Sequence, residues 1–419
     1  ETGKELISYT PLNRKDTPLP EPATPIPQPY EIETVEGLFL AGQHLEQYRH
    51  ATYSPLDYYD EALKKSPDDI RCNNAKGLWL LRRGSFSEAE RYLRIAVNKS
   101  TKHNPNPYDS EPLYNLALCL KHQGQYEEAH ELFLKSTWSA AQQDVAYLQA
   151  AYIDANWNKW NDALAHSDKS ILKNFHGLKA RHLKAVSLRK LNKIEEAIEL
   201  CTQTLTIDGF DYCTMYELSL CYLLQEKKSK ADDLISLIQK TIKQRNSTFI
   251  ELANQYADAG LYNEALAILK LNGDYPDALC LYYKAYFSLK TGNTSEASVY
   301  FKQALNNDVK SFPNRVEDIT VLKAAASFNP KDYKCLYYLG NFYYAKNLYE
   351  EARTAWESSI KINDQFPTTL RNLGIAYFNK FDRKKEALDL YDAAFIADPF
   401  DARLLFELDQ LKKRFKTSP

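Results

Sequence analysis

The sequence predicts an all-α fold, an α-solenoid that winds as a right-handed superhelix of about ten helical hairpins. Two observations predict it. From Val35 onward, small residues and large aromatic residues recur at a spacing that suits pairs of antiparallel helices. Only 13 of the 419 residues are glycine, which suits long helices. Each unit of such an array contacts only its neighbours, so the length of the chain does not require several domains.

A 34-residue pattern describes the repeat, with small residues at positions 8, 20 and 27 and proline at position 32. Pro67 stands at position 32 of one unit, and the next unit has Gly77 at position 8, Ala89 at position 20 and Ala96 at position 27. This spacing resembles the tetratricopeptide pattern, in which two antiparallel helices form one repeat. Small residues at positions 8 and 20 let the two helices cross closely. Proline at position 32 ends the second helix because it cannot continue a helix interior.

The same pattern continues to Pro399. Its small residues at positions 8 and 20 are the pairs Ala117 and Ala129, Ala151 and Ala163, Ala185 and Ala197, Ser219 and Ala231, Ala253 and Ala265, Ala285 and Ala297, and Gly340 and Ala352. The last unit has Gly374 and Ala387, one residue further apart. The register breaks at an irregular first unit (35–65), an inserted loop (98–110) and an inserted segment (307–330). Within that segment, residues 316–328 predict one extra helix. The amphipathic stretch 403–415 predicts a terminal capping helix, which solenoids need for solubility.

The first 33 residues differ from the rest of the chain. Seven of the 18 prolines fall between residues 11 and 29. Proline fixes φ and removes a hydrogen-bond donor, so residues 1–33 predict an extended, polyproline-like linker ahead of a repeat solenoid at residues 34–419. The short apolar run at residues 6–9 is either the last strand of an upstream domain or a frayed tail.

Composition excludes several function classes. Lys and Arg number 53 against 55 Asp and Glu, a balance that gives no electrostatic footprint for nucleic acid. No polybasic run suits an anionic membrane surface, and no apolar run approaches the roughly 20 residues of a membrane span. The seven cysteines are scattered through apolar helical stretches, which predicts buried, reduced thiols and a cytoplasmic protein.

Histidine spacing gives no metal-binding motif. His44 and His50 are six residues apart, and His122 and His130 are eight apart, so neither pair shares one helix face at ligand spacing. Phosphate-binding and nucleophile-elbow glycine motifs are also missing from the sequence. We therefore predict no metal, no cofactor, no catalytic residues and no enzymatic activity.

The inner groove carries the predicted binding surface. In this repeat class, positions 2, 5, 9 and 12 of the first helix face the groove. Tyrosines alternate there with Arg and Asn, which suits a peptide or a glycan because a flat ring offers area at low entropy cost. The alternative is that the tyrosines only pack against the neighbouring helix. Leu78, Tyr114 and Leu118 stand where a carboxylate clamp for chaperone tails would need Lys, Asn and Arg. The candidate binding residues are Arg71, Asn74, Tyr114, Tyr152, His182, Arg189, Tyr216, Asn254, Tyr282, Tyr286, Tyr337, Asn341, Tyr344, Arg371 and Phe378.

Five segments support a narrower resemblance, at residues 42–52, 71–74, 104–109, 179–185 and 337–341. With the proline-rich lead-in, they resemble the C-terminal half of large bacterial proteins that join a β-rich domain, domain of unknown function 5107, to tetratricopeptide repeats. The resemblance implies an upstream β-rich domain with a link to sugar metabolism. It assigns no catalytic residue to this half.

One helix after the linker is unusually dense in polar and titratable groups. It is an interface with the upstream domain, part of a shared sugar site, or a capping helix with a solvated face. Its candidate residues are Gln43, His44, Glu46, Gln47, Tyr48, Arg49 and His50. The sequence thus predicts a non-catalytic interaction scaffold whose partner is a peptide or its own upstream β-rich domain. The alternative is an accessory wall of a carbohydrate-active site formed with that domain.

Overall fold

The computed structural model describes residues 5, 7–11, 21–22, 24–48, 52–273 and 276–415. These residues contain 22 α-helices and two short 3-10 turns, and none of them forms a strand. The expected all-α tetratricopeptide-type solenoid is therefore confirmed. The chain divides into two compact units, Glu1–Cys72 and Asn73–Pro419.

The first unit is built on the hairpin of α1 (Val35–Tyr48) and α2 (Pro55–Lys65). The end of the proline-rich segment packs on this hairpin. The Tyr58 hydroxyl donates to the Pro27 carbonyl at 2.8 Å, and the Lys65 ammonium donates to the Ile32 carbonyl at 3.1 Å. A 3-10 turn, Pro29–Glu31, begins with proline, which tolerates the first helical position because the N–H there needs no partner. Residues 7–10 have no regular secondary structure, and residue 6 lies outside the described residues.

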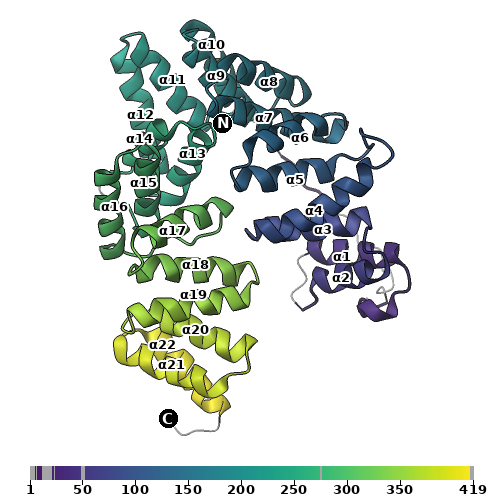
Figure 1. Ribbon diagram of the computed structural model, residues 1–419. Coiled ribbons are helices and arrows are strands. Elements are labelled where there is room, and N and C mark those ends of the chain that lie inside the picture. Colours follow the sequence, from purple (N-terminus) through teal and green to yellow (C-terminus); the bar gives the residue numbers. More distant parts are fainter. Residues whose placement is uncertain are drawn as a thin grey trace. The chain divides into compact units, whose positions relative to one another are not determined.

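The remaining described helices form nine more hairpins, one inserted helix and one cap, as the sequence pattern predicts (Figure 1). The inserted helix is α17 (Val316–Phe328) and the cap is α22 (Ala402–Arg414). The hairpins are α3 and α4 (Ile70–Leu81, Phe86–Thr101), α5 and α6 (Glu111–His122, Tyr126–Ser136), α7 and α8 (Gln143–Asn156, Trp160–Lys173), α9 and α10 (Leu178–Lys190, Ile194–Ile207), α11 and α12 (Tyr212–Leu224, Lys228–Ile242), α13 and α14 (Asn246–Asp258, Tyr262–Lys270), α15 and α16 (Ala278–Lys290, Thr294–Asn306), α18 and α19 (Tyr333–Ala345, Tyr349–Ile362), and α20 and α21 (Pro367–Lys380, Lys384–Ala397).

The turn between the two helices of a hairpin carries the repeat period in its backbone. Gly124, Asn158, Asn192, Glu226 and Gly260 all have positive φ and follow one another at intervals of 34 residues. Glycine and asparagine adopt this left-handed conformation at lower energy than other residues do. The turn therefore fixes the same chain reversal in successive units.

Within a hairpin, a small residue on the first helix faces a large residue on the second. A Cβ added to Gly77 would lie 2.6 Å from Leu93 Cγ and 3.3 Å from the Ala89 carbonyl oxygen. A Cβ on Gly340 would overlap the indole of Trp356 in the same way. Leu93 and Trp356, which both stand at position 24 of the 34-residue pattern, therefore pack inside their own hairpins.

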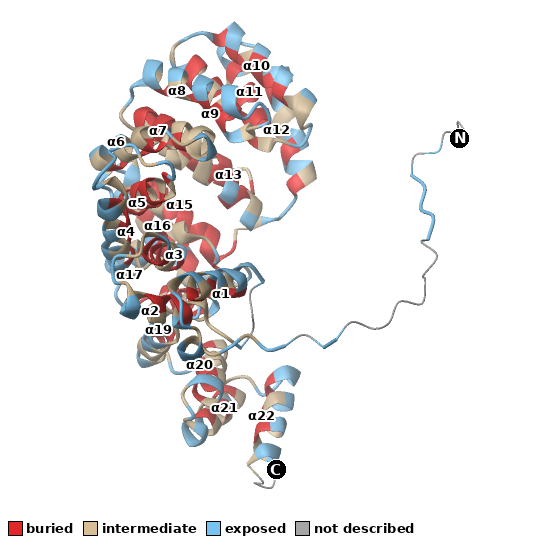
Figure 2. Cartoon of the chain, turned by 90° about the vertical axis from the view of Figure 1, so that its right-hand side faces the viewer, coloured by how far each residue is buried: buried red, intermediate tan, exposed pale blue. Residues whose placement is uncertain are grey.

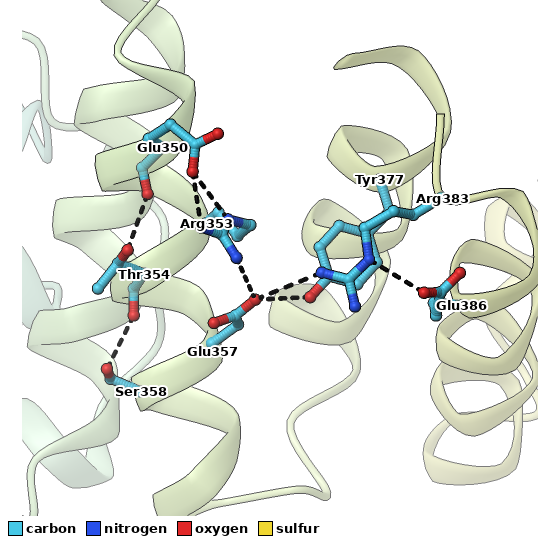
Figure 3. A network of polar contacts seen from close by, with 8 residues as sticks. All are labelled: Glu350, Arg353, Thr354, Glu357, Ser358, Tyr377, Arg383 and Glu386. Atoms are coloured by element: carbon cyan, nitrogen blue, oxygen red, sulfur yellow. Dashed lines mark hydrogen bonds and ion pairs between the residues drawn. The ribbon is translucent and has the colours of Figure 1, made fainter. Parts of the chain in front are cut away.

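Neighbouring hairpins are also joined by polar contacts, such as those that link α19 to α20 and α21 (Figure 3). Glu357 accepts a hydrogen bond from the Tyr377 hydroxyl at 2.6 Å and lies 3.4 Å from the Arg353 guanidinium. Arg383 stacks over the Tyr377 ring at 4.0 Å. Such half-exposed ion pairs contribute little stability, so the apolar contacts between helices carry most of it.

Burial follows the repeat pattern through the array. Figure 2 shows buried positions on successive helices, whereas the connecting loops are largely exposed. All seven cysteines are buried and unbridged, as predicted, and burial raises the pKa of the Cys119 thiol to about 12, which keeps it protonated. Among the described helices, none is both long enough and apolar enough to cross a lipid bilayer.

The Gly340 contact yields a stability prediction. Alanine is a better helix former than glycine by about 1 kcal/mol, so Gly340→Ala should stabilise the helix if space allowed it. We expect instead a loss of about 1–3 kcal/mol in the free energy of unfolding, because the added methyl group overlaps Trp356. Urea denaturation followed by circular dichroism measures this loss. Gly209→Ala is the control, since the nearest atom to its added Cβ is the Leu205 carbonyl oxygen at 3.8 Å. Equal stability of the two variants would contradict the prediction.

Candidate functional site

The structure places the predicted inner-face residues at very different depths. Seven are buried, namely Asn74, Tyr152, His182, Tyr216, Tyr282, Tyr337 and Asn341. Seven are half-buried, namely Tyr114, Arg189, Asn254, Tyr286, Tyr344, Arg371 and Phe378. Arg71, which belongs to the first unit, is exposed and pairs with Glu36.

The buried members join the first helices of successive repeats. The Tyr282 hydroxyl donates to Asp332 at 2.8 Å, and Asn341 accepts from Asn372 at 3.0 Å. In the middle of the array, Arg189 is ion-paired with the fully buried Glu217. These contacts are those of packing between repeats, which the sequence analysis kept as the alternative to ligand binding. The binding role of these residues remains a prediction.

The half-buried members Asn254 and Tyr286 open onto a cleft of about 700 Å³, a volume that includes its open mouth. The cleft forms where repeats that are not consecutive approach one another within the second unit. The Asn156 side chain, at the end of α7, donates to the Asp258 carbonyl at the end of α13, at 3.4 Å. The close approach is possible because Gly260 has no side chain: a Cβ there would lie 3.3 Å from Asn156 Cα.

Other residues of the cleft come from four further helices. Lys121 and His122 end α5, Tyr126 begins α6, Tyr262 begins α14, and Glu317 lies on the inserted helix α17. The insertion that breaks the repeat pattern therefore supplies one wall of the cleft.

Acidic groups outnumber cations in this cleft. Lys121 Nζ lies 3.6 Å from the Asp258 carboxylate and donates a hydrogen bond to Gln149 at 2.8 Å. Burial, together with the nearby Asp258, raises the pKa of Glu317. Burial and the neighbouring Lys121 lower the pKa of His122 to about 4, so this imidazole is neutral at pH 7. Two carboxyl groups therefore share one ammonium group.

Three half-buried tyrosines, Tyr126, Tyr262 and Tyr286, also line the cleft. Burial raises the pKa of Tyr286 to about 12, and it also raises the pKa values of Tyr126 and Tyr262. All three are neutral phenols at pH 7 and offer electron-rich ring faces. Aromatic faces next to carboxylates are the surroundings that proteins use to bind cationic groups.

The predicted groove residues include only part of this cleft, namely Asn254 and Tyr286. Tyr126, Tyr262 and Glu317 were not among the predicted site residues, because the groove positions of the pattern lie only on the first helix of each repeat. Tyr126 and Tyr262 each begin a second helix, at position 17 of the pattern. The sequence did contain a signal for these two tyrosines. Two units that the superhelix brings together both have an aromatic residue at position 17.

Helix α1 carries the predicted domain-interface residues. Gln43, His44, Gln47 and Tyr48 are exposed, and the His44 ring packs on Tyr48 with centroids 4.6 Å apart. Glu46 accepts a hydrogen bond from the Tyr59 hydroxyl at 3.3 Å. The two other candidates, residues 49 and 50, lie outside the described residues.

A second group was missed by sequence analysis. His130 on α6, Asp154 on α7 and His166 on α8 place one ring nitrogen each and a carboxylate oxygen within 4.8 Å of one another. Burial opposes ionisation of Asp154, but the two neighbouring imidazoles outweigh it and lower its pKa. The three residues come from three helices, so no spacing within one helix could reveal them.

Glu317 gives a test of the electrostatics of the cleft. A carboxyl group whose pKa is raised on folding binds more protons in the folded state than in the unfolded state. The free energy of unfolding therefore falls as the pH rises from the usual carboxyl pKa of 4.5 through the raised pKa of Glu317. Glu317→Gln removes this loss. We expect a higher urea midpoint for the variant near pH 7 and a difference that closes below about pH 4. Glu131→Gln, at an exposed position on α6, is the control. A variant that is less stable than the wild type near pH 7 would contradict the prediction.

Comparison with known proteins supports the repeat assignment. Residues 340–380 match a TPR repeat model, and residues 98–131 match a tetratricopeptide repeat model. A TPR repeat-containing protein of Methanocaldococcus jannaschii is 25% identical, and the match covers 83% of this chain and 66% of that protein, so the chain spans less than two thirds of its length. Among solved structures, a tetratricopeptide repeat protein from Parabacteroides merdae is 16% identical with a TM-score of 0.39, covering 64% of this chain and 98% of that one. MamA from Desulfovibrio magneticus is 20% identical with a TM-score of 0.37, covering 41% and 93%. The chain therefore carries tetratricopeptide repeats, which are protein-interaction modules, within an all-α solenoid.

Proposed function

We propose that this chain is a non-catalytic interaction scaffold whose cleft binds a cationic side chain, Lys or Arg, on a segment of a partner protein. One observation carries the proposal: Tyr126, Tyr262 and Tyr286 line the same cleft as Asp258 and Glu317, and only Lys121 supplies a cation among the described lining residues. A cationic guest would correct this imbalance of charge.

The energetics of the cleft favour such a guest. A cation that leaves water needs both a counter-charge and partners for its N–H groups. Asp258 and Glu317 offer the charge, and the tyrosine rings offer cation–π contacts, which are worth up to about 2 kcal/mol where water is excluded. Binding of the cation would also offset the burial and the repulsion from Asp258 that together raise the pKa of Glu317.

The scaffold itself lowers the free-energy cost of binding. The lining residues stand on helices that are packed into the array, so little side-chain freedom is left to lose when a partner docks. Asn156 and Asn254 lie at the same cleft and offer amide groups to the backbone of a bound segment. The proposal therefore places a peptide across the cleft with its cationic side chain inserted.

Selection from a random phage-displayed peptide library tests the cleft. We expect the selected peptides to be enriched in Arg or Lys, and the enrichment to disappear for the Asp258→Asn, Glu317→Gln double variant. Tyr286→Leu should raise the Kd of a selected peptide by about 2- to 30-fold, the loss of roughly 0.5–2 kcal/mol of cation–π interaction. Tyr108→Leu is the control, since that ring is 98% exposed and does not line the cleft. Selection of acidic peptides would overturn the proposal.

The carbohydrate alternative has one observation in its favour, because ring faces beside Asn and Asp side chains also suit a sugar ring. A glycan array separates the two candidates. Glycan binding that is lost in Tyr286→Leu, without enrichment of cationic peptides, would favour the carbohydrate site.

We further propose that helix α1 contacts the β-rich domain that the family resemblance implies. Tyr48 is 73% exposed, and Leu40 and Tyr30 of the same unit are also exposed. Large apolar side chains on a surface commonly mark an interaction site.

Calorimetric titration of this chain with the separately produced β-rich domain tests that contact. Tyr48→Ala should weaken binding at least about tenfold, because buried tyrosines are frequent hot spots of interfaces. Tyr108→Ala removes an exposed ring from the second unit and should leave the affinity unchanged. If the wild-type chain does not bind the domain, this partner is excluded.

A further inference from the structure

We propose that His130, Asp154 and His166 bind a divalent transition-metal ion, with zinc preferred, at a site that joins α6 to α7 and α8. His130 Nε2 lies 3.0 Å from Asp154 Oδ1, and His166 Nδ1 lies 2.7 Å from Asp154 Oδ2. The three ligand atoms are within 4.8 Å of one another. Ligands of a tetrahedral zinc ion are about 3.3 Å apart, so small rotations of the side chains would bring all three to the ion.

Charge favours a cation at this point. The Asp154 side chain is only 2% exposed, and within the described part of the chain its carboxylate meets the two imidazoles alone. A buried carboxylate is expensive unless a positive charge compensates it, and a neutral imidazole supplies a hydrogen bond without a full charge. A bound divalent ion would supply that charge.

The imidazole of His130 also points to a ligand. Its Nε2 is buried and close to Asp154 Oδ1, yet its N–H direction misses the oxygen, so this nitrogen forms no aligned hydrogen bond. A buried ring nitrogen without an aligned hydrogen-bond partner normally lowers the stability of the folded protein. Coordination of a metal by its lone pair would satisfy it.

Packing holds both rings in place. The His130 ring lies against Trp157 with centroids 5.2 Å apart, and the His166 ring is stacked on Tyr147 at 6.0 Å. Rings that are already fixed lose little freedom when they bind an ion, which raises affinity.

The proton balance is simple. In this structure His166 Nδ1 donates its hydrogen to the ionised carboxylate, because a carboxylate only accepts. On metal binding, the coordinating nitrogen of each imidazole must present a lone pair, so its proton moves to the other ring nitrogen through solvent. The imidazoles stay neutral, and the ion binds without oxidation or reduction.

The donor set selects the kind of ion. Two imidazole nitrogens and one carboxylate oxygen suit zinc and its neighbours among the transition metals, whereas magnesium and calcium prefer oxygen ligands. His130 and His166 are 16% and 14% exposed, so water can reach the ion and complete a tetrahedron. The ion would tie the hairpin of α5 and α6 to that of α7 and α8.

Calorimetric titration with Zn²⁺ tests the site on the untagged full chain, with Co²⁺ as a spectroscopic probe. We expect saturable binding of one Zn²⁺, a rise in Tm at saturating Zn²⁺, and the visible absorption of tetrahedral Co²⁺. His166→Gln and His130→Gln should each weaken Zn²⁺ binding at least about tenfold. His176→Gln and His103→Gln remove exposed histidines and should leave it unchanged.

The obvious third variant, Asp154→Asn, changes a buried residue and could fail to fold. The test therefore uses His130→Gln and His166→Gln, because both histidines are partly exposed. Circular dichroism checks that they fold. Absence of Zn²⁺ binding by the wild-type chain would overturn the proposal. The proposal would also be overturned if His166→Gln and His130→Gln left Zn²⁺ binding intact while His176→Gln or His103→Gln removed it.

Discussion

The close contact between a small residue on the first helix of a hairpin and a large residue on the second is the constraint on which the array depends. Gly77 against Leu93 and Gly340 against Trp356 set how near the two helices can lie. A single hairpin built this way still leaves one apolar face uncovered, so it is stable only when its neighbours cover that face. The spacing within each hairpin thereby fixes the spacing between hairpins.

Stacking then determines where ligand binding can occur. Polar residues that face the groove are largely used to join one repeat to the next, as Asn74 is to Asn115 and Tyr282 is to Asp332. The protein itself therefore supplies hydrogen-bond partners to these side chains. Of the groove side chains that remain partly exposed, Asn254 and Tyr286 lie at the cleft where α7 meets α13. That meeting is between repeats far apart in the sequence and leaves a cleft between them.

This division explains what the sequence could predict. Local periodicity identified each hairpin and even the inserted helix Val316–Phe328, because small residues and turn residues recur at fixed distances along the chain. Tyr286 was named because groove positions are local as well. Tyr262 and Glu317 were not, since their role depends on how the superhelix curves, and curvature accumulates from small rotations that no single repeat encodes. His130, Asp154 and His166 escaped because they stand on three different helices of neighbouring repeats, so no spacing within one helix connects them.

The two proposed sites share structural elements. Tyr126 of the cleft precedes His130 by about one turn of α6, and Asp154 precedes Asn156 of the cleft by two residues on α7. An ion held by His130 and Asp154 would therefore restrain two helices that line the cleft. If the ion holds Tyr126 and Asn156 in the positions that a bound peptide requires, it raises the affinity for the peptide. The peptide must then raise the affinity for the ion by the same factor, because coupling between two binding equilibria is reciprocal. The array would then link metal occupancy to partner binding through contacts that already hold its repeats together.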